Sequence, residues 1–256
     1  MRGVEGLRTV DRMQDIHTQP KSVTGSGAWA STFAAVYDPF LWIGERTGLR
    51  AARRELLAQA RGRTVEIGAG TGLNLPYYPD DIDDLAVTEP DAALRARLAT
   101  RLGRSGRTAR VVDAPAERLP FEDGSVDTVV STFVLCTVDA PDLAVREIGR
   151  VLRPDGQLLF IEHVRSESPT VAAWQDRLVR PWRRFARGCR CNRATAPLMV
   201  ACGLELEQVR TASWHAMPPI VRPLIAGRAR LGTTLSEHHA GVAGRAPSAS
   251  TEAVDR

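Results

Sequence analysis

In Val65-Glu66-Ile67-Gly68-Ala69-Gly70-Thr71-Gly72, three glycines follow directly on a short apolar segment. The segment, residues 64–67, is bounded by glycine and predicts a short buried strand. Glycines at the end of such a strand let the chain turn tightly and let a ligand approach the backbone closely. In an open parallel sheet, this edge is the crevice where ligands bind. The stretch therefore indicates both an α/β fold and the position of its site.

Strand and helix patterns alternate along the rest of the chain. Apolar runs predict further strands at 85–88, 109–112, 126–131 and 158–162. Helical spacing predicts helices at 33–41, 45–60, 91–102 and 140–152, and the turn Arg153-Pro154-Asp155-Gly156 ends the last one. Residues 204–211 and 221–230 supply two last strands, as a hairpin-like pair at the edge. We therefore expect an α/β fold with one seven-stranded, doubly wound, Rossmann-like sheet.

The chain divides into one domain with two tails. We expect residues 1–28 to form a mobile arm and residues 236–256 a disordered tail, because both offer little apolar surface to bury. Residues 29–235 form the single domain, which has a usual size. Inside it, the mainly helical residues 168–202 interrupt the alternation and predict an inserted helical cap.

The composition excludes several classes of protein. The 256 residues are 43% hydrophobic and 25% charged, which is typical of a globular domain. No apolar run reaches the about 18 residues of a membrane-spanning helix, and residues 1–21 lack the apolar stretch of a signal peptide. Four cysteines are too few for a disulfide framework, so we expect a cytoplasmic location. The net charge of +4 is spread without a basic stripe, and we expect no nucleic-acid partner.

Two kinds of ligand compete for the glycine loop. A dinucleotide site requires the spacing G-x-G-x-x-G, whereas the glycines here follow G-x-G-x-G, with Gly72 one residue early. Glu66, two residues before the first glycine, would repel a pyrophosphate and attract an ammonium or sulfonium group. Glu89 lies 23 residues further on, at the end of the second strand, where an acid accepts hydrogen bonds from ribose hydroxyls. This pattern favours S-adenosylmethionine over a dinucleotide.

Three stretches make the pattern specific: EIGAGTG (66–72), LPFEDGSVDTVV (119–130) and EIGRVLRPDGQLLFIEHV (147–164). They resemble class I S-adenosylmethionine-dependent methyltransferases, of the broad type that includes the ubiquinone and menaquinone methyltransferases. The resemblance covers residues 64–164 and implies the seven-stranded fold of that class. It also implies an enzyme that transfers a methyl group from S-adenosylmethionine to a small molecule.

By this resemblance, Glu66 holds the methionine amino group, the backbone of residues 68–72 lines the methionyl and ribose parts, and Glu89 binds the ribose. Residues 114–117 flank the adenine. The family usually has an acid where this chain has Pro115, so Glu117 or backbone groups are the alternatives for recognising the adenine amino group. The donor site expected in this way consists of Glu66, Gly68, Ala69, Gly70, Gly72, Asn74, Glu89, Pro90, Ala116, Glu117 and Thr132.

A closer resemblance extends beyond this core. The stretches GTGLNLPYYP (70–79), STFVLCTV (131–138) and FIEHV (160–164) look like the methyltransferase-like protein 7 family, as do Trp174, Trp182, Gly188, Cys189, Asn192 and Arg193. In animals these are membrane-associated thiol S-methyltransferases. The resemblance implies a small, apolar acceptor, with a thiol as the first choice. A lipid amine or a quinone-like ring is the alternative acceptor, and a donor-binding module without activity is the alternative function.

The acceptor side needs a proton acceptor near the strand ends. Methyl transfer from a sulfonium is an in-line displacement, and a thiol needs only a modest push toward the thiolate. His163 follows the fifth strand, and an imidazole titrates near neutrality, so His163 is the first candidate for a catalytic base. The alternative is that His163 only hydrogen-bonds a neighbouring loop. Glu162 and His215 are weaker candidates.

The cysteines favour neither covalent catalysis nor a metal. Cys136 is better explained as a small buried residue than as a nucleophile. Cys189 and Cys191 are separated by one residue, whereas structural zinc sites use a spacing of C-x₂₋₄-C with a second ligand pair. We therefore expect no metal site.

Residues 174–187 (WQDRLVRPWRRFAR) form a basic amphipathic segment. Trp174, Leu178, Trp182 and Phe185 fall near one helical face, and arginines occupy the rest. Such a segment either covers the active site with its apolar face or lies on a membrane surface. We expect the cap, with peripheral membrane contact as the alternative. The sequence leaves the oligomeric state open.

Overall fold

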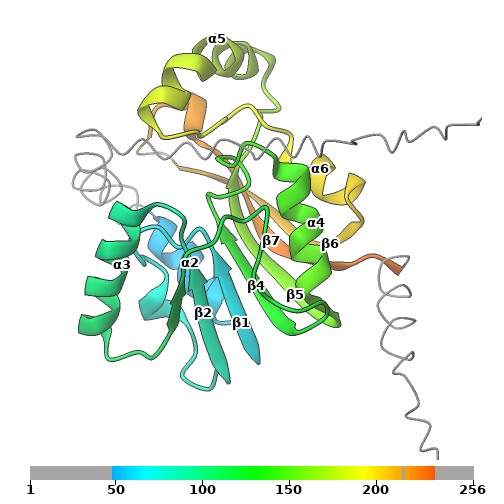
Figure 1. The fold of residues 1–256 in the computed structure, drawn as a ribbon. Coiled ribbons are helices and arrows are strands. Elements are labelled where there is room, and N and C mark those ends of the chain that lie inside the picture. Colours follow the sequence, from blue (N-terminus) through cyan, green and yellow to red (C-terminus); the bar gives the residue numbers. More distant parts are fainter. Residues whose placement is uncertain (1–47, 215–216, 234–256) are drawn as a thin grey trace, which may run out of the picture.

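The computed structural model describes residues 48–214 and 217–233, which form a sheet with helices on both faces (Figure 1). The predictions for residues 1–28, 33–41 and 236–256 and for His215 fall outside the described residues. The expected single Rossmann-like fold is confirmed in the described part.

The sheet has seven strands in the order β3-β2-β1-β4-β5-β7-β6. Their bounds are β1 Arg63–Ile67, β2 Asp84–Thr88, β3 Arg110–Val112, β4 Val126–Thr132, β5 Leu152–His163, β6 Leu204–Ser213 and β7 Pro223–Leu231. Strands β1 to β5 pair in parallel, and β7 is antiparallel to both β5 and β6. The expected pairing of the last two strands is confirmed, and β7 lies inside the sheet, between β5 and β6. Strand β6 therefore ends at the same edge as the five parallel strands.

The helices are α2 Arg50–Leu57, α3 Ala92–Ser105, α4 Pro141–Val151, α5 Pro169–Phe185 and α6 Thr195–Ala201, with short 3-10 turns η2 Leu75–Tyr77 and η3 Pro219–Val221. The turn expected at residues 153–156, between α4 and the next strand, is instead part of β5 in the structure. Strand β5 begins at Leu152, directly after α4, and residues 153–156 form an irregularity inside it. The register shows this, because Leu152 pairs with Val126 and Gln157 pairs with Thr128.

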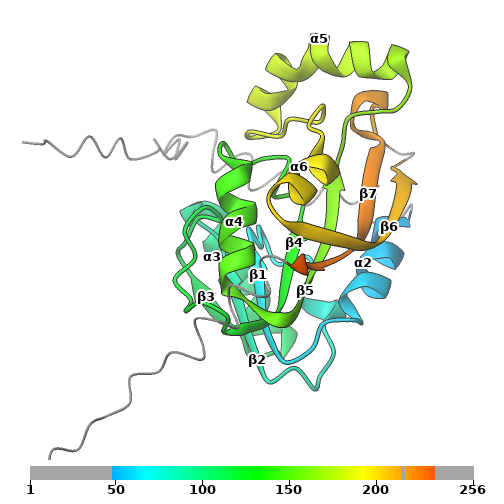
Figure 2. The same cartoon turned by 90° about the vertical axis from the view of Figure 1, so that its right-hand side faces the viewer.

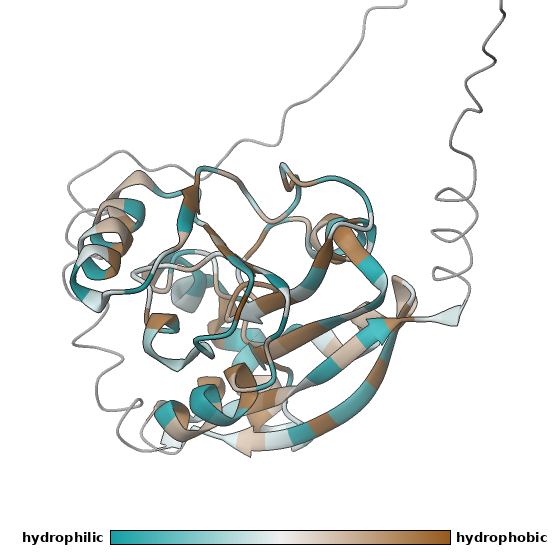
Figure 3. Cartoon of the chain, turned by 90° about the horizontal axis from the view of Figure 1, so that it is seen from below, coloured by the Kyte–Doolittle hydropathy of each residue, from teal (hydrophilic) through white to brown (hydrophobic). Residues whose placement is uncertain are grey.

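Two hydrophobic layers hold the helices against the sheet. One layer includes Leu57 of α2 and Leu98 of α3, and the other includes Ile148 of α4 and Met199 of α6. Helices α2 and α3 accordingly lie on one side of the sheet, and α4 and α6 on the other (Figure 2). Successive strand residues point to opposite layers, so the central strands are buried on both faces, and Figure 3 shows apolar residues along the strands.

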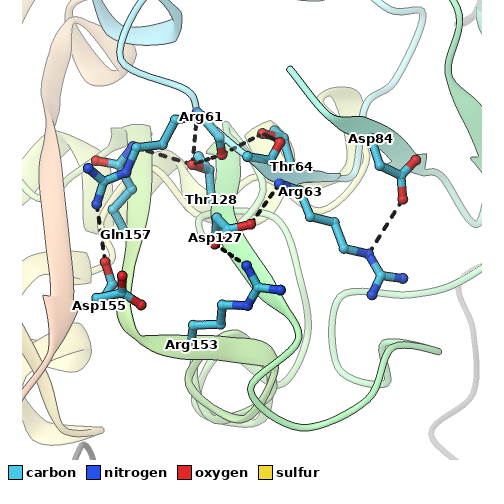
Figure 4. Close-up of polar contacts among 10 residues, drawn as sticks. Arg61, Arg63, Thr64, Asp84, Asp127, Thr128, Arg153, Asp155 and Gln157 are labelled. Carbon is cyan, nitrogen blue, oxygen red and sulfur yellow. Dashed lines mark hydrogen bonds and ion pairs between the residues drawn. The ribbon is translucent and has the colours of Figure 1, made fainter. Parts of the chain in front are cut away.

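A polar network closes the sheet edge opposite the glycine loop (Figure 4). The Asp127 carboxylate accepts a 2.7 Å hydrogen bond from the Arg63 backbone. The Thr128 hydroxyl accepts from the Arg61 N–H at 3.1 Å and donates to the Arg61 carbonyl at 2.9 Å. The Gln157 amide lies 3.3 Å from the same hydroxyl. These bonds tie together the amino ends of β1 and β4 and the bulged part of β5.

Helix α5 lies beyond the end of the sheet, away from the two helical layers, in both views (Figures 1 and 2). It follows β5 directly and contacts η3. Within residues 48–214 and 217–233, no helix is both long enough and apolar enough to cross a bilayer.

Candidate active site

The glycine loop after β1 has a backbone conformation that only glycine adopts easily. Gly68, Gly70 and Gly72 have φ angles of 55°, 58° and 82°. A Cβ atom at Gly68 would lie 2.8 Å from Val134 Cγ2. The N–H of Ala69 donates a 2.8 Å hydrogen bond to the last carbonyl of β2, which holds the loop over the strand ends. Main chain rather than side chains therefore lines this part of the site.

Glu66 lies on β1 just before the loop and is 2% exposed. The Tyr78 hydroxyl donates to its Oε2 and the Asn74 amide to its Oε1, each at 2.8 Å. The same amide donates to Thr132 Oγ1 at 3.0 Å, and Asn74 Oδ1 accepts a 2.6 Å hydrogen bond from Arg53. The structure therefore brings three of the residues that are expected to bind S-adenosylmethionine, Glu66, Asn74 and Thr132, into one hydrogen-bond network. Sequence reasoning missed Tyr78 and Arg53 as members.

Burial raises the pKa of Glu66 from 4.5 to about 7. The hydrogen bonds from Tyr78 and Asn74 and the charge of Arg53 oppose this shift, and the charge of Glu89 adds to it. No ion pair of the described residues involves Glu66. A cation beside this carboxylate would favour its ionised form, so the site fits the ammonium group of S-adenosylmethionine.

Glu89 lies at the end of β2 and is 5% exposed. Its Oε2 accepts a 2.8 Å hydrogen bond from the Gly70 N–H, and its Oε1 accepts one of 2.9 Å from the Asp91 N–H. The carboxylate therefore links the glycine loop to the turn after β2. Burial raises its pKa, and the two backbone hydrogen bonds oppose the shift. The oxygens keep further lone pairs that can accept from hydroxyl groups.

The loop after β3 lies beside this turn. Strand β3 pairs in parallel with β2, and the Glu89 N–H donates to the Val112 carbonyl at 3.0 Å. Ala116 on this loop is 4% exposed, whereas Glu117 is half-buried. Pro90, on the turn after β2, is exposed. These residues share the carboxyl edge of the sheet with the glycine loop.

His163 is the last residue of β5 and is 6% exposed. Its Nδ1 is buried and has no hydrogen-bond partner among the described residues. Burial lowers the pKa of His163 from 6.5 to about 4. The expectation that His163 titrates near neutrality is wrong, because desolvation outweighs the Val221 hydrogen bond. The ring is therefore neutral at physiological pH, and one of its two nitrogens is a hydrogen-bond acceptor.

Phe133 and Trp214 stack with His163. The ring centroids of Phe133 and His163 are 4.7 Å apart, those of Phe133 and Trp214 5.6 Å, and those of His163 and Trp214 5.9 Å. Phe133 directly follows Thr132, with a φ of 60°. Trp214 follows the last residue of β6. Sequence reasoning named the neighbouring His215 instead, although the expected end of this strand already pointed to the region.

Glu162 holds the turn after β4. It is fully buried and accepts a 2.7 Å hydrogen bond from the Ser131 hydroxyl. It also accepts backbone hydrogen bonds from Val134, Leu135 and Cys136 at 3.0–3.1 Å. These four bonds occupy the carboxylate, which removes Glu162 as a candidate base.

Cys136 is fully buried, and its sulfur lies 4.0 Å from that of Cys189. The hydrogen bond with Cys189 and burial raise the pKa of the Cys136 thiol well above 9. The prediction of a small buried residue is confirmed. Within the described ranges, no group of three or more His, Cys, Asp or Glu side chains is placed to hold a metal ion.

The segment after α5 covers the strand ends. Arg187 forms an ion pair with Asp91, the N-cap of α3 on the turn beside Glu89. The Arg190 N–H donates a 2.7 Å hydrogen bond to the Cys136 carbonyl. These contacts reach the loops after β2 and β4, so the segment caps the carboxyl edge of the sheet.

Helix α5 itself does not turn all its large apolar residues inward. Leu178 and Trp182 pack on the core, but Trp174 is 51% exposed and Phe185 is 44% exposed. The expectation that these four side chains form one covering face is therefore wrong. The buried positions of the helix are Ala172 and Gln175, because the Gln175 amide hydrogen-bonds three backbone carbonyls below it.

Known proteins share this sequence pattern. Residues 65–160 match the family described as a methyltransferase domain. The chain is 32% identical to the thiol S-methyltransferase TMT1B of Homo sapiens over 191 residues, which is 70% of this chain and 76% of that protein. It is 34% identical to the human thiol S-methyltransferase TMT1A over 173 residues, which is 64% of this chain and 69% of that protein.

Solved structures share the fold. A S-adenosylmethionine-dependent methyltransferase from Thermotoga maritima, described as a possible histamine N-methyltransferase, matches with a TM-score of 0.60. The match covers 78% of this chain and 96% of that chain, with 21% identity. At this identity the likeness concerns the fold alone.

Proposed function

The chain belongs to the S-adenosylmethionine-dependent methyltransferases, in the family of the human thiol S-methyltransferases TMT1A and TMT1B, and from this we propose that it methylates the sulfur of a small, apolar thiol. The methyl donor is S-adenosylmethionine, which supplies a methyl group already activated by its bond to a sulfonium sulfur. The protein has to bind this donor, align the acceptor with it and exclude water.

We assign donor binding to the residues around the glycine loop. Glu66 pairs with the ammonium group, which is consistent with a buried carboxylate that has no ion-pair partner in the described part of the chain. Glu89 accepts hydrogen bonds from the ribose hydroxyls, and Asn74 with Thr132 keeps Glu66 in position. The remaining contacts come from Gly68, Ala69, Gly70 and Gly72 along the backbone, and from Pro90, Ala116 and Glu117 around the adenine.

The observation that carries the choice of a thiol is the buried, neutral imidazole of His163, whose Nδ1 has no hydrogen-bond partner among the described residues. A thiol has to lose its proton when its sulfur is methylated. With a pKa of about 4, His163 does not ionise a free thiol of pKa about 8.5 beforehand. We propose that Nδ1 takes the proton as the carbon–sulfur bond forms, when the sulfur becomes more acidic. Phe133 and Trp214 add apolar surface for the rest of the acceptor.

A screen of thiols, phenols and amines with methyl-labelled donor tests this function. We expect methylated thiols as products, and no product without the protein. His163→Ala and His163→Phe should both lower turnover at least tenfold, because both remove the proton acceptor. Calorimetry should show unchanged affinity for S-adenosylhomocysteine in both variants.

His163→Phe is the sharper variant because it keeps a ring that can stack with Phe133. Methylation of a lipid amine or a quinone-like ring, with no thiol accepted, would contradict the choice of acceptor. Normal turnover by both variants at every pH would remove His163 from the mechanism.

We also propose a cytoplasmic location with peripheral membrane contact through residues 174–187 as the way an apolar acceptor arrives. The exposed Trp174 and Phe185 support this, because interfacial segments use such side chains beside arginines. Sedimentation with vesicles that contain anionic lipid tests it. Trp174→Ala should reduce the bound fraction, and equal binding by both proteins would contradict the contact.

A further inference from the structure

Two buried polar atoms beside the proposed acceptor site have no hydrogen-bond partner within residues 48–214 and 217–233. They are Nδ1 of His163 and Nε1 of Trp214, in residues that are 6% and 3% exposed. The indole N–H is a donor, and in a neutral imidazole Nδ1 is an acceptor when the other ring nitrogen carries the proton. Buried polar atoms are nearly always paired, so an unpaired donor and an unpaired acceptor in contacting rings call for an explanation.

The fold places both rings at the same sheet edge. His163 pairs with Leu224 at the start of β7, and Ser213, the residue before Trp214, pairs with Pro223 on the other side of β7. The centroids of the two rings are 5.9 Å apart with their planes inclined by 20°, and Phe133 stacks with both. The two rings are therefore neighbours, and one sulfur or oxygen atom that bridges their unpaired nitrogens would make two hydrogen bonds of about 3 to 3.5 Å.

We propose that Trp214 is a specificity-determining residue, whose indole N–H donates a hydrogen bond to the same acceptor atom that gives its proton to His163 Nδ1. The proposal rests on the proposed methyl transfer and names the class of nucleophile. A group that accepts one hydrogen bond and donates another satisfies both orphaned atoms at once, which a thiol or a hydroxyl does.

The number of lone pairs then separates the acceptor classes. A thiol or hydroxyl has two, so that one accepts from Trp214 and the other attacks the methyl group. A neutral amine has one, and a hydrogen bond from Trp214 would occupy the pair that must attack. In the reaction the S–H bond breaks, its proton goes to Nδ1 and a carbon–sulfur bond forms. The electron pair of the broken methyl–sulfonium bond stays on the sulfur of the donor.

The first experiment observes the indole N–H directly. We would label the full chain with ¹⁵N, saturate it with S-adenosylhomocysteine and titrate it with benzenethiol, phenol or aniline. Trp214→Phe identifies the Trp214 signal by its disappearance. We expect all three ligands to shift this signal, because the lone pair of aniline is also free to accept when no methyl group is transferred. An unmoved Trp214 signal with a bound thiol would overturn the proposal, and the shifts themselves are measured on the natural sequence.

The second experiment compares variants. Trp214→Phe keeps the stacked ring and should weaken thiol binding about five- to tenfold, which corresponds to one hydrogen bond. It should leave aniline turnover unchanged, because the attacking lone pair of an amine cannot also accept from Trp214, so that the preference for sulfur over nitrogen falls. Trp182→Phe is the matched control, because Trp182 lies in α5 and its indole faces Cys189 rather than His163. If Trp214→Phe lowered the turnover of benzenethiol and aniline equally, Trp214 would contribute to packing and not to the choice of the acceptor atom.

The two proposals fail in different ways. A chain that methylates amines and no thiols would contradict the proposed function. A chain that methylates thiols while Trp214→Phe keeps the full preference for sulfur over nitrogen would contradict only the role of Trp214.

Discussion

The hydroxyl of Tyr78 donates a 2.8 Å hydrogen bond to Oε2 of Glu66, and both side chains are buried. Burial and this hydrogen bond have opposite effects on the pKa of Glu66. Burial raises the pKa of Glu66 to about 7, and the Tyr78 hydrogen bond lowers it. The same contact and burial raise the pKa of Tyr78 well above 10, so the phenol stays a donor. The Tyr78 hydroxyl therefore favours the ionised form of Glu66, together with the Asn74 amide and the charge of Arg53.

Donor affinity should rise with pH. Below pH 7 the free protein holds Glu66 largely protonated, and a cationic ligand has to displace that proton. We expect the affinity for S-adenosylhomocysteine, which keeps the ammonium group, to increase between about pH 5.5 and 7 and then to level off. Calorimetry in buffers of different ionisation enthalpy should detect the released proton. A flat affinity across this range would show that Glu66 is ionised before the ligand binds.

Tyr78→Phe should move this dependence to higher pH. Without the hydroxyl, the carboxylate loses one of the hydrogen bonds that favour its charged form, so the pKa of Glu66 rises further. The midpoint of the affinity profile measures the shift. Tyr77→Phe is the matched control, because the neighbouring ring has no hydrogen bond to Glu66 and contacts Arg54 instead. Identical midpoints for Tyr78→Phe and the natural sequence would exclude this role of the hydroxyl.

Glu66→Gln should stabilise the free protein while abolishing donor binding. The folded pKa of about 7 lies above the unfolded value of 4.5, so the folded state binds more protons between these values. Stability from this group is therefore present below pH 4.5 and is lost as the pH rises to 7, by about 3 kcal/mol at most. At pH 8 the variant should have a higher melting temperature than the natural sequence, and this difference in melting temperature should vanish near pH 4.5. If Glu66→Gln were less stable than the natural sequence at pH 8, the buried charge of Glu66 would not destabilise the folded protein.

The sequence predicts the sheet well because its strands carry strong local signals. Residues 126–131 were expected as a strand and form β4 Val126–Thr132, since β-branched residues fill a strand buried on both faces. Glu66 and Glu89 lie at the strand ends where the spacing puts them, since parallel strands end at one edge. Local pattern and sheet topology together fix these positions.

The remaining site residues depend on contacts that no local pattern carries. Tyr78 reaches Glu66 because the 3-10 turn Leu75–Tyr77 brings the chain back over β1. Trp214 joins His163 only after β6 and β7 have paired at the far side of the sheet. The pKa of His163 follows from burial, which depends on the packing of the whole edge.

Gly68→Ala should destabilise the protein and weaken donor binding. The residue has a φ of 55°, and its new Cβ would lie 2.8 Å from Val134 Cγ2. We expect a loss of about 1–3 kcal/mol in the free energy of unfolding. Gly103→Ala in α3 is the control, since a Cβ there meets nothing within 4 Å and φ is not positive. It should stabilise by about 0.5–1 kcal/mol. Denaturant titration compares the two, and similar effects would argue against strain at Gly68.

Two substitutions at Asp91 should separate its two roles. Oδ1 accepts hydrogen bonds from the N–H groups of Ala93 and Leu94 at 2.9 Å, while Oδ2 pairs with Arg187 after α5. Asp91→Asn keeps an oxygen for the cap but loses the ion pair, so amide exchange should speed up in residues 186–189 and not at the start of α3. Asp91→Ala removes both contacts, so exchange should also rise in the first turn of α3, with a further loss of about 1 kcal/mol. Equal exchange in residues 186–189 for Asp91→Asn and the natural sequence would show that the ion pair does not hold the cap on the strand ends.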